Sequence, residues 1–80
     1  MFQQYDVVRV VKVLRESAVS DQGHDIRRPR VGDQATVLEI YSDPFGYELE
    51  CCDEDGITIW LGGYSQDDLQ LELVWEAPAT

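Results

Sequence analysis

The chain has 80 residues, of which 44% are hydrophobic, and a formal net charge of −10 at neutral pH. This length suits a single small domain, which we expect over residues 1–76, followed by a frayed tail at residues 77–80. The negative charge disfavours nucleic acid as a partner because phosphate neutralisation dominates such binding, and no apolar run approaches the ~20 residues that cross a membrane.

Periodicity predicts β-strands nearly throughout the chain. The first strand, Tyr5–Leu14, is rich in valine and apolar on both faces, with Val7 and Val11 adding to the second face. Such a strand is either covered on both sides or is an edge strand that pairs with a second copy of the chain. A homodimer is therefore one of two interpretations. Polar residues, glycine and proline then predict a long loop over residues 15–31.

A second strand is predicted over Gln34–Tyr41, followed by a turn at residues 42–46 that contains proline and glycine. The third strand alternates, which places Cys51 inward and Cys52 outward. A three-residue turn at 54–56 joins it to the fourth strand. The resulting register pairs Asp53 with Ile57, Cys51 with Ile59, Glu50 with Trp60 and Leu49 with Leu61. Its parity turns Trp60 outward and the following residues inward: Leu49, Cys51, Ile57, Ile59 and Leu61.

Gly62–Gly63 are expected to end the fourth strand. Ser65 then caps a single helical turn over residues 65–68, and Leu69–Trp75 forms the fifth strand with its leucines on one face. Five short antiparallel strands, a long first loop and one helical turn before the last strand predict an all-β, five-stranded SH3-like barrel.

Stretches with a family pattern run through most of residues 5–72: Tyr5–Arg9, Val31–Asp33, Thr36–Glu39, Tyr47–Glu50, Asp53–Gly56 and Asp67–Leu71. They resemble a small bacterial SH3-like family known only as domain of unknown function 4926. Ala35 stands where that family usually has glycine, and the first loop is longer here. Because the family has no assigned activity, the resemblance implies the fold and leaves the function open.

A second, local resemblance lies in the first loop. Residues 23–32, which contain Gly-His and Pro-Arg in that order, are similar to a segment of the SH3-like domain of the nitrile hydratase β subunit. This resemblance implies an accessory subunit of a nitrile hydratase-like enzyme. The metal-binding cysteine motif of that enzyme belongs to its other subunit and is absent here.

The residues do not predict a catalytic or metal site. His24 is the only histidine and falls in a polar loop, so we expect no enzyme activity and no cofactor. The acidic turn at residues 53–55 lacks the spacing of a calcium loop, and Cys51 and Cys52 form no zinc motif. Reduced cysteines and the lack of a visible signal peptide favour the cytoplasm.

The charges divide sharply along the chain. All six basic residues lie in the first thirty positions, whereas residues 31–80 carry twelve acids and no base. The Arg27–Arg30 segment is therefore either a recognition loop for carboxylates or an offset to the acidic body beside it. Crowding among the carboxylates predicts raised pKa values and greatest stability at mildly acidic pH.

We therefore expect a non-catalytic module that binds a protein partner through the arginine loop and exposed aromatic side chains. The residues expected to contact the partner are Arg27, Arg28, Arg30, Trp60, Tyr64 and Glu50. One alternative is an inhibitor or immunity-type protein whose carboxylates (Glu48, Glu50 and Glu72) block a basic partner. The other is the nitrile hydratase-like accessory subunit.

Overall fold

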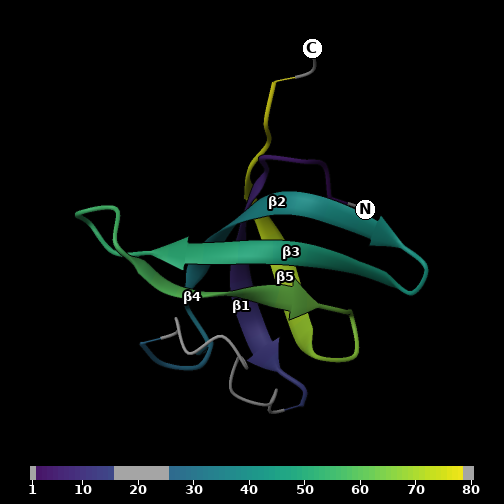
Figure 1. Ribbon diagram of the computed structural model, residues 1–80, viewed down its shortest axis with the longest axis horizontal. Coiled ribbons are helices and arrows are strands. Elements are labelled where there is room, and N and C mark those ends of the chain that lie inside the picture. Colours follow the sequence, from purple (N-terminus) through teal and green to yellow (C-terminus); the bar gives the residue numbers. More distant parts are fainter. Residues whose placement is uncertain (1, 16–25, 79–80) are drawn as a thin grey trace.

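The computed structural model describes residues 2–15 and 26–78, which form one five-stranded antiparallel sheet without a helix (Figure 1). The strands are β1 (Val7–Val13), β2 (Gln34–Ser42), β3 (Phe45–Cys52), β4 (Thr58–Tyr64) and β5 (Leu69–Trp75). Their order in the sheet is β4-β3-β2-β1-β5. All five predicted strands are thus confirmed. The sheet is not closed, since β4 and β5 lie at its two edges.

The core lies where the sheet folds over itself. In Figure 1, β2, β3 and β4 run side by side while β1 and β5 cross them at a steep angle. Each of four strands places a fully buried side chain in this space: Val8 and Val10 from β1, Val37 from β2, Leu49 from β3 and Trp60 from β4. Full burial of an aliphatic side chain of this size contributes roughly 1.5–3 kcal/mol. The cysteines follow the expected alternation, with Cys51 buried and Cys52 exposed.

The β3–β4 hairpin contains a bulge that reverses the predicted orientation of β4. Cys52 pairs with Thr58, but Cys51 pairs with Trp60, which leaves Ile59 as the extra residue. Because side chains alternate along a strand, one extra residue exchanges the two faces beyond it.

The predicted pairs of Cys51 with Ile59, Glu50 with Trp60 and Leu49 with Leu61 are therefore wrong. Glu50 instead pairs with Leu61, and Trp60 faces the core with no exposed surface. Ile57, expected inside, is 56% exposed.

The end of β4 also differs from the prediction. Gly62–Gly63 continue the strand to Tyr64 instead of ending it. A Cβ atom on Gly62 would lie 3.3 Å from the Tyr64 ring, and that ring packs edge-on against Trp60 at 5.5 Å. Glycine at position 62 thus makes room for the aromatic pair.

Residues 65–68 form a single hydrogen-bonded turn that is not part of a helix. Ser65 does act as its cap, because Ser65 Oγ accepts a hydrogen bond from the Asp67 N–H at 3.1 Å. The Ser65 carbonyl also accepts the N–H groups of Asp68 and Leu69. With β5 starting at Leu69, no room remains for a further helical residue.

The ends of the described chain are tied together by a buried carboxylate. Asp6 is 2% exposed, and its side chain accepts hydrogen bonds from the backbone N–H groups of Gln3 and Ala77, both at 2.8 Å. Ala77, the first residue of the expected tail, is accordingly buried. β1 lies between β2 and β5, so the interpretation of this strand as a dimer edge is wrong.

Candidate functional site

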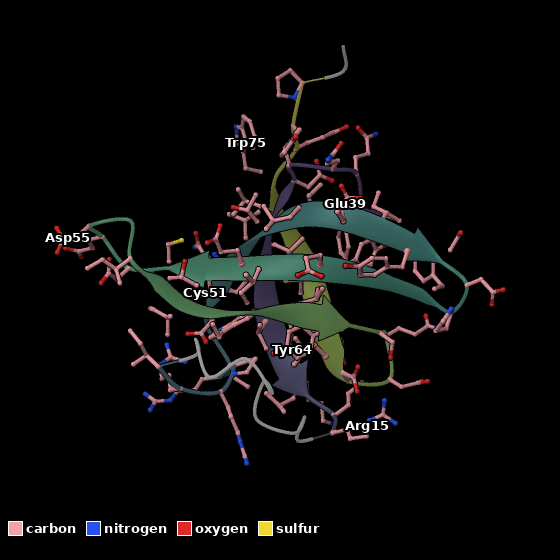
Figure 2. All side chains as sticks on the ribbon, viewed as in Figure 1. Arg15, Glu39, Cys51, Asp55, Tyr64 and Trp75 are labelled. Atoms are coloured by element: carbon pink, nitrogen blue, oxygen red, sulfur yellow. The ribbon has the colours of Figure 1, made fainter. Side chains whose placement is uncertain are left out.

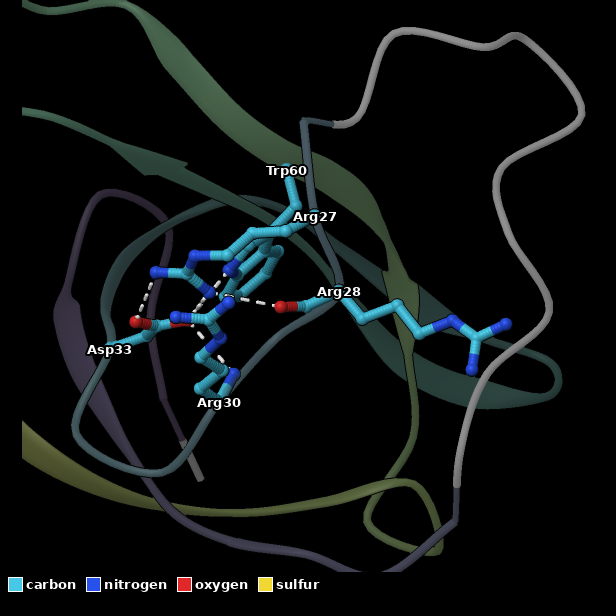
Figure 3. Close-up of polar contacts among 5 residues, drawn as sticks. All are labelled: Arg27, Arg28, Arg30, Asp33 and Trp60. Carbon is cyan, nitrogen blue, oxygen red and sulfur yellow. Dashed lines mark hydrogen bonds and ion pairs between the residues drawn. The ribbon is translucent and has the colours of Figure 1, made fainter.

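Residues from two distant parts of the chain meet at the carboxylate of Asp33 (Figure 3). Arg27 Nη1 and Nη2 donate to the two carboxylate oxygens at 2.8 Å each, which makes a bidentate ion pair. The Trp60 Nε1–H and the Arg30 backbone N–H both donate to Oδ2 at 2.9 Å. We call these four residues the Asp33 cluster.

The local sequence shapes the turn that presents Asp33. Gly32 has a φ of +97°, a conformation that glycine adopts without strain. Its N–H donates to the Val10 carbonyl at 2.8 Å, and the Val10 N–H donates to the Asp33 carbonyl at 2.8 Å. The turn is therefore fixed against β1, with the Asp33 carboxylate directed at β4.

The charges of Asp33 and Arg27 stabilise each other, as the directions of both pKa shifts indicate. Burial alone would raise the pKa of Asp33, but hydrogen bonds from Arg27, Trp60 and the Arg30 backbone outweigh it and lower the pKa to about 2. The same hydrogen bond raises the pKa of Arg27. Burial, with the nearby Asp33 charge, raises the pKa of the Cys51 thiol to about 11, so this cysteine is a poor nucleophile.

The expected contact residues do not form one exposed surface. Arg27 is held by Asp33, while the Arg28 side chain points away from the cluster (Figure 3). Trp60 and Tyr64 are both buried, so the expectation that they expose apolar area to a partner is wrong. The physical reason is the bulge at Ile59, which turns Trp60 inward.

The glutamates of the expected acidic face each contact a neighbour within the sheet. Glu50 accepts a hydrogen bond from Thr58 Oγ1 at 2.6 Å. Glu48 accepts one from the Tyr41 hydroxyl, and the carboxylate of Glu72 pairs with Arg9 at 2.5 Å. These contacts hold each carboxylate against its own strand pair.

A second region, which the sequence analysis missed, lies between the β2–β3 turn and the β4–β5 turn. Two adjoining hollows of about 540 and 720 Å³ share Phe45, Ser65 and Gln66 as lining residues. The first is lined mainly by apolar side chains: Phe2, Leu14, Phe45, Tyr47, Leu69 and Leu71. The second adds aromatic and acidic ones: Tyr41, Asp43, Tyr64, Asp67 and Asp68. We call the two hollows together the aromatic groove.

The floor of the aromatic groove is held by contacts among its own rings. Tyr47 packs against Phe2 at 5.5 Å and edge-on against Phe45 at 5.1 Å. The Tyr47 hydroxyl also accepts a hydrogen bond from the Phe2 N–H at 3.1 Å. At Gly46, an added Cβ would approach the Tyr64 carbonyl oxygen to 3.0 Å, so glycine allows the two turns to come close.

The carboxylates on the rim of the aromatic groove differ in whether they form an ion pair. Asp68 pairs with Arg15 at 2.6 Å. Burial would raise the pKa of Asp68, but hydrogen bonds from Ser65 and Arg15 outweigh it and lower the pKa. Asp43 and Asp67 are exposed and take part in none of the ion pairs among the described residues. A usable sequence signal was the pair of aromatics, Tyr41 and Phe45, on either side of an Asp-Pro turn.

Other site types find little support in the described part of the chain. Among residues 2–15 and 26–78, no three side chains of the metal-binding types gather at one place. No helix in those ranges is long and apolar enough to cross a membrane. His24 lies outside the described residues.

Comparison of the chain with protein-family models, with curated proteins and with solved structures finds no match. The two resemblances drawn from the sequence therefore stay predictions. The function has to be argued from the site itself.

Proposed function

We propose that the protein is a non-catalytic interaction module of the SH3-like barrel type, which binds a protein partner in the aromatic groove. The observation that carries this proposal is the pre-formed apolar floor of the groove. Phe45 is 37% exposed although it packs against Tyr47. Aromatic side chains at the centre and polar groups at the rim are typical of protein–protein interfaces.

The arrangement of the strands supports the SH3-like part of the proposal. Five short antiparallel strands follow one another in the order β4-β3-β2-β1-β5, and the sheet curls so that its two halves cross (Figure 1). A long connection between β1 and β2 and a short turn before β5 also fit such a barrel.

The groove is a better candidate than the arginine loop for a physical reason. An arginine that already makes a bidentate pair gains little from a second carboxylate, and Arg27 makes such a pair with Asp33. Trp60, the aromatic expected beside the loop, has no exposed surface. The exposed apolar side chains of the described loop residues, Ile26 and Val31, are aliphatic, so this part of the loop offers none of the aromatic anchors that are enriched at the centres of interfaces.

A second candidate function is an inhibitor or immunity-type protein that blocks a basic partner. The observation in its favour is the exposed pair of carboxylates on the groove rim, Asp43 and Asp67. Both candidates use the same surface and differ in whether binding silences the partner.

Site-specific photo-cross-linking in living cells tests the proposal. A benzophenone amino acid replaces Gln66 on the groove, Arg28 on the loop, or Glu54 at the tip of the β3–β4 hairpin, all of which are exposed. We expect a discrete protein adduct from position 66 that is absent from positions 28 and 54. Adducts from position 28 alone, or the same adducts from all three positions, would contradict the proposal.

A further inference from the structure

The charge and shape of the aromatic groove also indicate its ligand. We infer that the groove takes an extended segment of a basic partner, in which a lysine or arginine lies next to an apolar side chain. This inference rests on the proposed function and deepens it by naming the chemistry of the partner.

The cation preference follows from the charges at the rim. Arg15 neutralises Asp68, which leaves the exposed Asp43 and Asp67 on the rim of the second hollow. Glu48 lies close by, because its carboxylate accepts the hydroxyl of Tyr41, another lining residue. The lining of this hollow carries three aspartates against one arginine, Arg15, so its field favours cations and repels acidic segments.

The second hollow also offers rings to a cation. Tyr41 and Phe45, which are both exposed, line it together with the two aspartates. A positive side chain near an aromatic face is attracted by the negative charge density of the ring face. The carboxylates and the rings of the second hollow therefore both attract a lysine or arginine side chain.

The apolar requirement follows from the adjoining first hollow. The first hollow has a volume of about 540 Å³, lies next to the second hollow and shares Phe45 with it. Its wall includes Leu69 and Leu71, so a neighbouring apolar side chain would be removed from water there. Gln66 and Gln70 on its rim are exposed amides that can both donate to and accept from a peptide backbone.

Three synthetic peptides test this inference against an isotope-labelled protein observed by nuclear magnetic resonance. The first, Gly-Lys-Leu-Ser-Lys-Leu-Lys-Gly capped at both ends, combines cations with apolar side chains. The second has Glu in place of each Lys, and the third has Ser in place of each Leu. We expect the first alone to bind, with the largest amide shifts at Phe45, Gln66 and Leu71.

A matched pair of double variants separates the rim from the overall charge. Asp43→Asn with Asp67→Asn should weaken the first peptide about fivefold, as expected for the loss of two exposed charge contacts. Glu54→Gln with Asp55→Asn removes the same charge from the distant hairpin tip, labelled at Asp55 in Figure 2. This control should change the dissociation constant less than twofold.

Several results would overturn the inference. Equal weakening by the two double variants would assign binding to net charge, and equal binding of the Glu peptide would remove the cation preference. Groove signals that move on dilution without peptide would identify a second copy as the occupant. An adduct at position 66 with no binding of any peptide would overturn this inference and leave the proposed function standing.

Discussion

The Asp33 cluster and the aromatic groove are built from similar residues but use them in opposite ways. In the cluster, Arg27 and Trp60 both donate to one carboxylate, so charge and indole are satisfied within the chain. In the groove, Asp43 and Asp67 are exposed beside Phe45, a partly exposed ring that packs edge-on against Tyr47. A dense run of charge therefore indicates a binding surface only where the chain itself leaves that charge unmatched.

Removal of the Asp33 carboxylate should give the largest change in stability. Asp33→Ala leaves the Arg27 charge half-buried and deprives the fully buried Trp60 of its hydrogen-bond acceptor. We expect the free energy of unfolding to fall by about 3 kcal/mol. Denaturant unfolding followed by tryptophan fluorescence measures it.

The control for that substitution is Asp55→Ala at the exposed hairpin tip. It removes the same charge where the side chain supports no buried donor, so the change should stay within about 0.5 kcal/mol. Equal losses for the two variants would show that the Asp33 cluster does not hold the fold.

The arginines of the loop should differ in their effects on stability. Arg27→Ser breaks the bidentate pair and should lower the free energy of unfolding by about 2 kcal/mol. Arg28→Ser with Arg30→Ser, which removes two exposed side chains, should change it by less than about 0.5 kcal/mol. Similar losses of stability in both variants would mean that the arginines act together, by offsetting the negative charge of residues 31–80.

Strong acid should destabilise the protein, at pH values below the mildly acidic range in which charge crowding predicts the greatest stability. The pKa of Asp33 is lowered to about 2 in the folded state against 3.8 for the free side chain. A lowered folded-state pKa gives stability that is present above pH ~4 and lost as the pH falls toward the folded value. Between pH 5 and 2.5 this one group should account for about 1.5 kcal/mol.

The pH dependence is checked by denaturant unfolding of the natural protein and of Asp33→Ala across that range. The lowered pKa of Asp68 acts in the same direction, so the variant should still lose stability, only less steeply. If the free energy of unfolding fell equally steeply with pH in both proteins, Asp33 would not contribute to the acid sensitivity.

The strands could be predicted because alternation and turn residues are local signals. The register of β4 could not, since Ile59, Trp60 and Leu61 are consecutive apolar residues and suit either face. Two non-local facts decide it: the largest ring fills the core, and its N–H reaches Asp33, which lies 27 positions earlier in the chain. The groove was missed for the same reason, because it joins residues 41–47 to residues 63–71 and to Phe2, Leu14 and Arg15 across the fold.

The yield of the cross-link from position 66 tests most directly the claim that the groove binds and the arginine loop does not. It is measured in three backgrounds: the natural sequence, Phe45→Ser, and Arg28→Ser with Arg30→Ser. We predict that Phe45→Ser reduces the adduct at least about tenfold, the loss expected when an aromatic anchor is truncated, while the arginine variant keeps it. Loss of the adduct in the arginine variant, with retention in Phe45→Ser, would contradict the account and return the binding site to the loop.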